Sequence, residues 1–217
     1  MQIAIIGAGN VGGALGKGWA RAGHAITYGV PDPSDAKYRA TAEAAGGASL
    51  LPVSRAVQGA DATVLAVPFD AVGDALTAAG DLSGRLLIDV TNPLRMGATG
   101  LELAIGFDHS AAEHVASLAP GAAVFKTLNQ VGFELMENTA GYAAPPVMFV
   151  AGDDPARKPV VMGLVSDLGF RAVDAGGLRV ARLLEPFGML WIHMAINRKA
   201  GRDNAFAYLP RSQDLGP

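Results

Sequence analysis

The sequence has no cysteine among its 217 residues. This absence excludes a disulfide scaffold, a thiol nucleophile and a cysteine-ligated zinc site. Charged residues are also scarce: they make up 17% of the chain, against a typical value of about 25%. Disordered chains combine high charge with low hydrophobicity, whereas half of this chain (50%) is hydrophobic. The composition therefore predicts a folded protein with a substantial core.

A basic excess is missing too, since the formal net charge is -3 at pH 7. Binding to nucleic acid or to an anionic membrane through bulk electrostatics is therefore not expected. The most apolar late stretch, residues 187–196, is far shorter than the roughly 20 residues that cross a bilayer. The first residues lack the basic region and the cleavage site of a signal peptide. We expect a cytoplasmic protein with no membrane-spanning segment.

Short apolar runs alternate with helical patterns along the chain, which is typical of βαβ units and a mostly parallel sheet. The runs are rich in Val, Ile and Leu without polar alternation, as in strands covered by helices on both faces. The predicted strands are residues 2–6, 25–30, 62–67, 86–90, 122–128, 147–151 and 170–174, with a further short one at 49–51. The predicted helices are residues 11–22, 35–45, 71–79, 111–119, 155–168 and about 180–198.

A glycine-rich loop follows the first predicted strand and opens the first predicted helix. Gly7, Gly9 and Gly12 have the GxGxxG spacing of dinucleotide-binding loops. The first glycine permits a tight turn, the second lets a pyrophosphate approach the backbone, and the third lets the helix pack on the strand. The helix N-terminus then offers unpaired N–H groups to the phosphates. In this context we interpret the loop as a dinucleotide site rather than an ordinary turn.

The loop and the alternating pattern together predict a Rossmann-type, doubly wound α/β fold. The strand pattern stops after Gly177, where a single apolar helix takes over. We therefore assign residues 1–177 to a domain that binds a nicotinamide or a flavin dinucleotide, and residues 178–217 to a short C-terminal helical segment. This helix packs on the sheet or on a second subunit, and its apolar residues 189–192 are a candidate interface.

The residues after the second predicted strand bear on which dinucleotide binds. Asp32 lies about where an acidic residue binds a ribose hydroxyl in such domains. Because Asp32 stands between two prolines, a turn role fits equally well, and both alternatives stay open. The arginine that would hold a 2′-phosphate does not follow the strand directly, but Lys37 and Arg39 come soon after.

Three loops at the predicted carboxyl edge of the sheet combine small polar residues with rigid or apolar ones, as pocket walls do. Ligands of open α/β sheets bind beyond the carboxyl ends of the strands. Together with the glycine loop, these loops favour a binding cleft over a set of ordinary turns. They are residues 67–70, 91–94 and 126–132.

Candidate acids, bases and metal ligands are few. The four histidines lack the spacing of metal ligands, so no metal site is predicted. Glu185 lies in an apolar run, where a buried carboxylate needs a partner. It would pair with Arg182, cap a neighbouring element or serve a site, and we favour the structural roles. Lys126 and Asn129 superficially resemble a pair in hydroxyacid dehydrogenases, but they leave a strand here and receive no such role.

This shortage of acid–base groups favours one class of reaction. Hydride transfer between two redox cofactors needs mainly positioning, because the cofactors carry the chemistry. A dehydrogenase acting on an alcohol needs a proton donor or acceptor.

An ordered series of motifs resembles the coenzyme F420-dependent NADP oxidoreductase family, and also the related oxidoreductase domain of STEAP-type metalloreductases. The segments that carry the resemblance extend over nearly the whole chain. They are residues 5–12, 88–94, 110–115, 120–129, 149–154, 167–170, 174–178 and 182–185. The resemblance implies a Rossmann domain with a helical C-terminal part, a homodimer, and hydride transfer between NADP(H) and a deazaflavin (coenzyme F420) or a flavin (FAD or FMN).

Motif and resemblance together predict a set of cofactor-binding residues. They are Gly7, Gly9, Asn10, Val11, Gly12, Val30, Asp32, Lys37, Val67, Pro68, Phe69, Asn92, Pro93 and Asn129. No catalytic residue is assigned, although the resemblance makes Asn129 a candidate for positioning the nicotinamide or the acceptor. The resemblance also implies that the second cofactor stacks over the nicotinamide, against the loop 129–132.

The chain departs from the family where Val30 and Pro31 replace the usual Ser-Arg that holds the 2′-phosphate. Lys37 would compensate, and NAD remains an alternative to NADP. Two further functions stay open. One is a dehydrogenase or imine reductase acting on a small organic substrate, since pyrroline-carboxylate reductases have a similar glycine loop. The other is a non-catalytic dinucleotide sensor.

Overall fold

The computed structural model describes residues 1–98 and 100–209. Its main sheet contains the strands β1 (Gln2–Ile6), β2 (Ala25–Val30), β3 (Ser49–Pro52), β4 (Ala62–Leu65), β5 (Leu86–Asp89), β8 (Ala123–Lys126), β9 (Val147–Gly152) and β10 (Arg171–Gly176). A separate hairpin consists of β6 (Leu94–Gly97) and β7 (Gly100–Leu103). The helices are α1 (Asn10–Arg21), α2 (Arg39–Ala44), α3 (Val53–Gln58), α4 (Val72–Ala79), α5 (Ala111–Leu118), α6 (Phe133–Glu137), α7 (Lys158–Asp167) and α8 (Ala181–Ile192).

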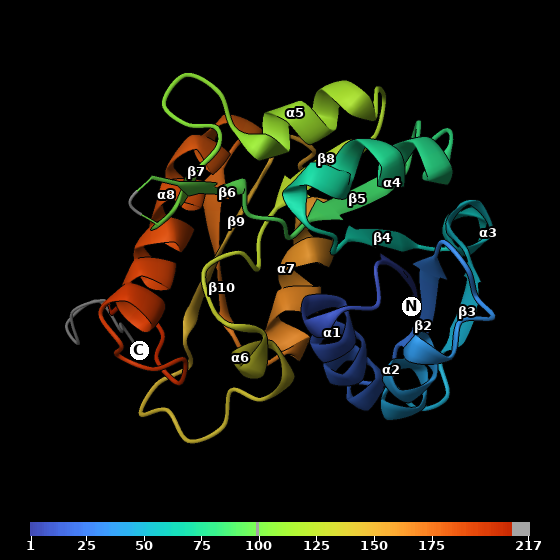
Figure 1. The fold of residues 1–217 in the computed structure, drawn as a ribbon, viewed down its shortest axis with the longest axis horizontal. Coiled ribbons are helices and arrows are strands. Elements are labelled where there is room, and N and C mark those ends of the chain that lie inside the picture. The colour runs from blue at the N-terminus through green and yellow to red at the C-terminus, as the bar shows by residue number, and fades with distance from the viewer. Residues whose placement is uncertain (99, 210–217) are drawn as a thin grey trace.

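The strand order of the main sheet is β10-β9-β8-β5-β4-β1-β2-β3 (Figure 1). Neighbouring strands pair in parallel, with the exception of β8 and β9, which pair antiparallel. Strand order reverses beside β1, so the loops after β1 and β4 diverge there and leave room for a ligand. The predicted Rossmann-type, mostly parallel sheet is confirmed.

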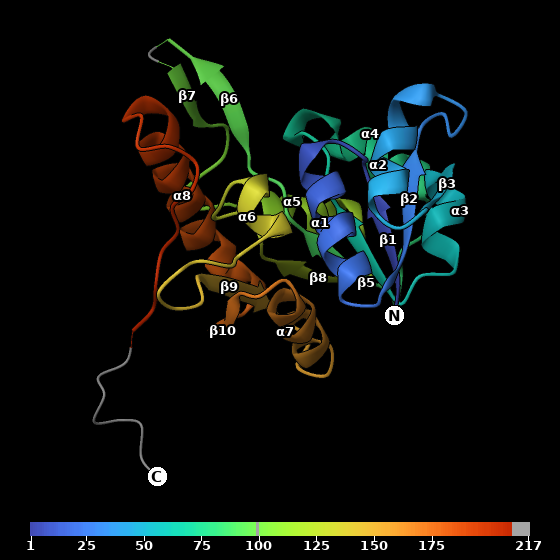
Figure 2. The same cartoon turned by 90° about the horizontal axis from the view of Figure 1, so that it is seen from below.

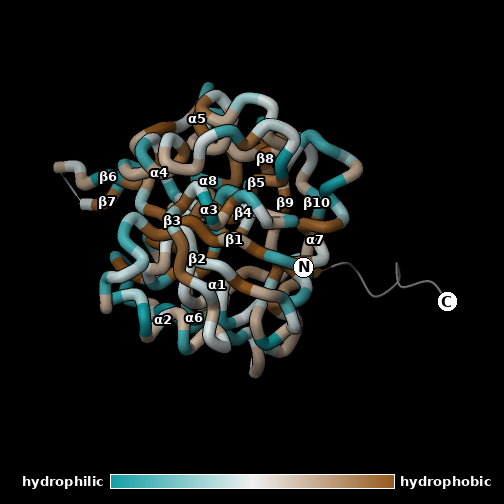
Figure 3. The backbone as a smooth tube through the Cα atoms, turned by 90° about the vertical axis from the view of Figure 1, so that its right-hand side faces the viewer, coloured by the Kyte–Doolittle hydropathy of each residue, from teal (hydrophilic) through white to brown (hydrophobic). Residues whose placement is uncertain are grey.

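Helices cover both faces of the sheet, and alternate residues of each strand enter different layers. In β1, Ile3 and Ile5 join a buried cluster with α1 and α7, whereas Ala4 and Ile6 join a second cluster with α3, α4 and α5. This two-sided burial explains why the strands lack polar alternation. In Figure 3 the hydrophobic segments accordingly gather in the middle of the molecule.

The glycine loop is held in the geometry that its motif predicts. Gly7 has a φ of +105°, which favours glycine, and a Cβ there would lie 2.4 Å from the backbone oxygen of Ala66. A Cβ on Gly12 would lie 2.1 Å from the backbone oxygen of Gly7. A side chain at Gly7 would therefore collide with the segment that follows β4, and a side chain at Gly12 would push α1 away from the glycine loop. These two glycines set how closely the helix N-terminus approaches the carboxyl edge.

Several elements differ from the sequence prediction. The predicted strand 122–128 ends at Lys126, because Leu128 adopts a left-handed φ of 57°. The predicted strand 62–67 ends at Leu65. The helices α3 and α6 and the hairpin were not predicted, since α3 and α6 are too short to show a helical period. The last predicted helix is present despite Pro186, as α8 followed by a π-helical turn over His193–Asn197.

The helix α8 packs on α5 and on β7 of the hairpin. Trp191, Ile192 and Ala195 form a small buried cluster with Leu94 of the hairpin and with Phe206 beyond the helix. Figure 2 shows the hairpin standing away from the main sheet beside the outer end of α8. None of the described helices is both long and apolar enough to cross a membrane.

Candidate functional site

A cavity of about 350 Å³ lies at the carboxyl edge of β1, β4 and β5. Its wall comes from the glycine loop and from the loops that follow β4 and β5. The lining residues are Gly9, Asn10, Val11, Ala66, Val67, Pro68, Phe69, Val90, Thr91, Asn92 and Leu94. The structure thus brings together residues of the glycine loop and of two of the three predicted loops, whereas no residue of the third predicted loop, 126–132, lines this cavity. We call this space the first cavity.

A second cavity of about 490 Å³ lies on the other side of the glycine loop, between α1, α2 and α6. It shares Gly9 and Asn10 with the first cavity, and two lysines, Lys17 and Lys37, are among its lining residues. Lys37 forms an ion pair of 2.8 Å with Asp35. The N-terminus of α1 therefore stands between two hollows, one mainly apolar and one with basic side chains.

The N-terminus of α1 is free of side-chain caps among the described residues. Its N-cap is Gly9, which forms no side-chain cap hydrogen bond, and its first turn has no acidic residue. By contrast, the Ser110 hydroxyl caps α5 by accepting a hydrogen bond from the Glu113 backbone. Free N–H groups and the helix dipole make the start of α1 suited to an anion.

Some predicted residues lie outside both cavities. Val30 is buried at the end of β2, and Pro93 is buried where the hairpin begins. Asp32 is exposed, and its Oδ1 accepts hydrogen bonds from the Ser34 hydroxyl at 2.7 Å and backbone N–H at 2.9 Å. These bonds, the hydroxyl one first, hold the pKa of Asp32 below its ordinary value. Asp32 thus takes part in a turn, which is one of its two predicted alternatives.

Asn92 and Asn129 form a reciprocal pair. The Asn92 side-chain amide donates to the Asn129 backbone oxygen at 2.9 Å, and the Asn129 amide donates to Asn92 Oδ1 at 3.1 Å. The Asn129 amide also donates to the Leu184 backbone oxygen of α8 at 3.0 Å. Gly188 permits this contact, since a Cβ there would lie 2.6 Å from the Asn129 oxygen. Asn129 is 2% exposed, so it supports Asn92 instead of lining the first cavity.

A buried charged cluster, formed by Asp89, Lys126 and Glu185, lies at the ends of β5 and β8. Lys126 Nζ is 2.9 Å from Asp89 Oδ2 and 3.4 Å from Glu185 Oε1. Sequence reasoning missed this cluster, because only the adjacency of β5 and β8 brings Asp89 beside Lys126.

Glu185 caps a neighbouring element, as one of its alternatives predicted. Its carboxylate accepts hydrogen bonds from the backbone N–H groups of Ala111 at 2.8 Å and Ala112 at 3.0 Å, at the start of α5. Burial raises the pKa of Glu185. The alternative pairing with Arg182 is wrong, because Arg182 binds Glu113 through two nitrogens. That bond lowers the pKa of Glu113 to about 2.

The first cavity can orient a ligand but has little means of exchanging protons with it. Among the described residues that line it, none is titratable. Its polar side chains are Asn10, Thr91 and Asn92, and Thr91 Oγ1 is buried without a hydrogen-bond partner in the described structure. A buried hydroxyl without a partner is unfavourable, so a bound polar group would satisfy it.

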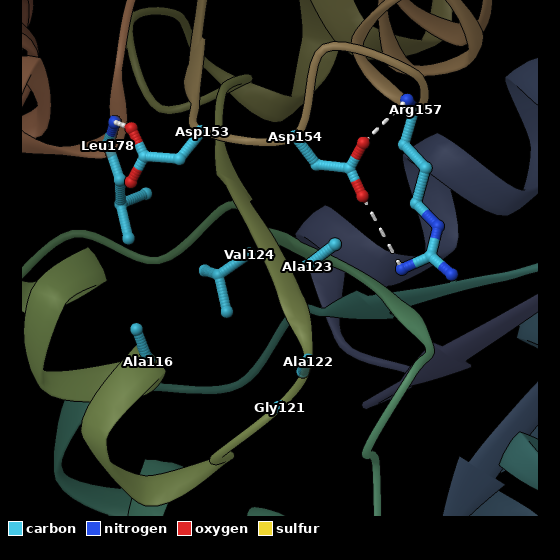
Figure 4. A pocket seen from close by; sticks show the side chains of 9 residues that line it. All are labelled: Ala116, Gly121, Ala122, Ala123, Val124, Asp153, Asp154, Arg157 and Leu178. Carbon is cyan, nitrogen blue, oxygen red and sulfur yellow. Dashed lines mark hydrogen bonds and ion pairs between the residues drawn. The ribbon is translucent and has the colours of Figure 1, made fainter.

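A further cavity of about 390 Å³ lies near the start of β8 and the end of β9, at the edge opposite the glycine loop (Figure 4). Its polar side chains are engaged within the chain. Asp153 accepts a hydrogen bond from the Leu178 backbone at 3.0 Å, and Asp154 pairs with Arg157 at 3.7 Å. This cavity is not a candidate site.

No group of three or more potential metal ligands occurs among the described residues.

Residues 2–93 match the family model of NADP oxidoreductases dependent on coenzyme F420. The predicted resemblance to this family is therefore confirmed for the part of the chain that contains the glycine loop and all the lining residues of the first cavity except Leu94.

Solved structures extend the likeness to nearly the whole chain. A candidate F420-dependent NADP-reductase from Arthrobacter sp. FB24 is 29% identical, with a TM-score of 0.87 over 97% of this chain and 100% of its own. A hypothetical protein from Sinorhizobium meliloti is 28% identical, with a TM-score of 0.72 over 82% of this chain and 86% of its own. A reductive aminase from Aspergillus terreus, solved with NADPH, is 20% identical, with a TM-score of 0.67 over 91% of this chain and 63% of its own. This last likeness shows the fold alone.

Proposed function

We propose that this chain is an oxidoreductase that binds NADP(H) across its glycine loop and transfers a hydride between it and a deazaflavin (coenzyme F420) or a flavin. The observation that carries the proposal is the first cavity, which adjoins an uncapped helix N-terminus and has no titratable side chain among its described lining residues. Such a wall suits a reaction in which both partners carry their own redox chemistry. The match of residues 2–93 to F420-dependent NADP oxidoreductases supports the same assignment.

The residues around the α1 N-terminus fit a pyrophosphate. Gly9 has open space where a Cβ would stand, with no atom within 4 Å, so a phosphate can approach the backbone there. The N–H groups of Asn10 and Val11 would donate to it, aided by the helix dipole. Because both cavities meet at Gly9 and Asn10, one nucleoside would extend to each side of the pyrophosphate.

The first cavity would hold the nicotinamide, which supplies the hydride chemistry when it is bound. Val67, Pro68 and Phe69 would form an apolar wall that excludes water from one side. Thr91 Oγ1, which lacks a partner in the described structure, and Asn92 would bind the polar edge of the ring. Asn129 would position Asn92 from behind through their reciprocal hydrogen bonds.

Lys37 would bind the 2′-phosphate of NADP in place of the missing arginine. It lines the second cavity and is exposed, so it can leave Asp35 and turn to a ligand. A lysine binds phosphate as a point charge rather than through two parallel bonds. The preference for NADP over NAD is therefore expected to be modest, and Asp32 would contribute to binding NAD if the preference were reversed.

Titration of the purified protein with NADPH and with NADH, followed by addition of coenzyme F420, FAD or FMN, tests this function. We expect NADPH to bind and to be oxidised only after an acceptor is added. Binding of both dinucleotides without oxidation in the presence of any of the three acceptors would contradict the proposal and favour a dinucleotide sensor. Faster oxidation of NADH would contradict the NADP assignment alone.

A second candidate is a reductase that acts on imines without a flavin. Its support is the fold likeness to the reductive aminase that was solved with NADPH. This chain spans 63% of that protein, and the wall of its own first cavity has no titratable group among the described side chains. NADPH oxidation by cyclic imines in the absence of any flavin would favour this candidate over the first.

We also propose that the protein is a homodimer that associates through α8 and the β6–β7 hairpin. Large apolar side chains are exposed there, including Met96 (76%), Leu183 (69%) and Leu190 (48%). A hairpin that stands away from its own sheet is marginally stable by itself, so a second subunit that covers it would stabilise it. We expect sedimentation velocity at micromolar concentration to give a dimer, and Leu183→Glu to shift it toward monomer. A monomeric wild-type protein would contradict this assembly.

A further inference from the structure

The Lys126 ammonium is buried, with two hydrogen-bond acceptors and a second carboxylate around it. Its side chain has no exposed surface, and Nζ contacts Asp89 Oδ2 at 2.9 Å, the Thr91 backbone oxygen at 2.5 Å and Glu185 Oε1 at 3.4 Å. An ammonium has three N–H donors, and three acceptors surround this one. Burying a charge in this way requires fixed partners, so the geometry around Lys126 is tightly specified.

The same ion pair holds both backbone groups of Thr91. The Thr91 oxygen accepts from Lys126, and its N–H donates to Asp89 Oδ1 at 2.9 Å. Asp89 and Lys126 are direct neighbours across the paired strands β5 and β8. The side chains of Asp89 and Lys126 therefore orient the loop after β5, beyond the last backbone hydrogen bonds of the sheet. Thr91 and Asn92, which follow Val90 in this loop, are two of the three polar side chains that line the first cavity.

The charged cluster also reaches the C-terminal helix. Glu185 of α8 contacts Lys126 and caps α5, while the Leu184 oxygen of α8 accepts from Asn129. Leu184 thus contacts Asn129 directly, and Glu185 is connected to Thr91 through Lys126. A movement of α8 would be transmitted to the polar wall of the first cavity through these contacts.

We propose that Lys126 is a positioning residue for hydride transfer, which acts by fixing the Thr91 backbone and so the polar wall of the first cavity. A buried ion pair is often no better for stability than apolar residues of the same volume. An apolar pair at this place would leave the Thr91 oxygen and N–H without these partners. The specific contribution of Lys126 is therefore the orientation of the loop. The inference rests on the proposed function, since it places the nicotinamide in the first cavity.

Lys126→Met tests the inference, because methionine keeps much of the stem and removes the N–H donors. We expect kcat to fall by about tenfold to hundredfold, since small displacements of reacting groups have large effects on rate. We expect KM for NADPH to change by less than about threefold, because the pyrophosphate contacts of α1 are unaltered. The primary deuterium isotope effect on kcat should rise, which a purely structural loss of folded protein would not produce.

Lys158→Met is the matched control. Lys158 Nζ also binds one carboxylate, Asp174 at 2.7 Å, and one backbone oxygen, Gly176 at 2.9 Å, but it lies between α7 and β10, away from the first cavity. The kcat of the Lys158→Met variant is expected to be unchanged.

If Lys126→Met does not fold, Asp89→Asn replaces it, because asparagine has the size of the aspartate that pairs with Lys126. This variant is expected to lower kcat at least about fivefold, with the same small change in the KM for NADPH. A folded variant of either residue with kcat within twofold of wild type contradicts the inference.

Hydrogen exchange separates failure of this inference from failure of the proposed function. Loss of the ion pair is expected to speed exchange at the Thr91 amide by about tenfold or more, and Lys158→Met is expected to leave it unaltered. If the wild-type protein does not oxidise NADPH, the proposed function fails, and the exchange at Thr91 still reports on Lys126. Unchanged exchange in Lys126→Met and in Asp89→Asn contradicts the positioning role, whatever the activity.

Discussion

Gly9→Ala is expected to weaken dinucleotide binding strongly while leaving the fold intact. No atom lies within 4 Å of the place where its Cβ would stand, and its φ is -80°, so alanine fits the protein without strain. The same space is where a pyrophosphate would approach the N-terminus of α1. We expect the Kd for NADPH to rise by about hundredfold or more, equivalent to roughly 3 kcal/mol, as measured by fluorescence titration.

Substitutions of two further glycines distinguish a loss of binding from a loss of folding. Gly73 in α4 also has nothing within 4 Å of an added Cβ, so Gly73→Ala is the matched control and should bind NADPH normally. At Gly12 an added Cβ would lie 2.1 Å from the Gly7 oxygen, so Gly12→Ala should lower both stability and binding. If Gly9→Ala binds NADPH within threefold of wild type, the pyrophosphate does not lie against this backbone and the proposed binding mode is wrong.

Glu185→Ala is expected to lower the free energy of unfolding by about 3–5 kcal/mol, the range found when one partner of a buried ion pair is removed. The change leaves two N–H groups at the start of α5 without their acceptor and leaves Lys126 with less compensating charge. For a chain of this length the loss corresponds to a decrease in Tm of roughly 10 °C. Urea denaturation followed by circular dichroism measures it.

Asp167→Ala is the control for this prediction. Asp167 pairs with His24 at 2.9 Å, but its side chain is 44% exposed, and exposed pairs contribute less than about 1 kcal/mol. A Glu185→Ala variant as stable as Asp167→Ala would mean that the charged cluster adds nothing to the packing of α8 against α5. In that case the link from α8 to the first cavity would also lose its physical basis.

The predictable parts of this fold are those with a local cause. The turn at Gly7 and the close packing at Gly12 follow from the absence of a Cβ, and the motif spacing predicted both. The central strands are recognisable because burial on both faces requires continuous apolar runs. The loops after β4 and β5 were predicted to share an edge, and residues 67–69 and 91–92 indeed line one cavity.

The features that were not predicted are contacts between segments that are distant in the sequence and adjacent only in the fold. Lys126 and Asp89 meet only because β8 lies beside β5, and a single sequence does not specify that order. Asn129 was a candidate for positioning the nicotinamide or the acceptor, but the sequence did not show its contacts with Asn92 and with α8, which approaches closely at Gly188. The hairpin was not predicted, because strands of four residues whose side chains are half-buried or exposed show no clear alternation.

The most direct test of the central claim is to follow deuterium from C4 of NADPH in a single turnover with coenzyme F420 in ordinary water. NADPH samples that carry deuterium on one or the other face of the nicotinamide ring at C4 are reacted separately, and the reduced coenzyme F420 is analysed by mass spectrometry. If the first cavity holds the two rings together without a proton-exchanging side chain, deuterium from one face alone will be found in the reduced coenzyme. Reduced coenzyme without deuterium from either face, or no reduction at all, would contradict direct hydride transfer in this site.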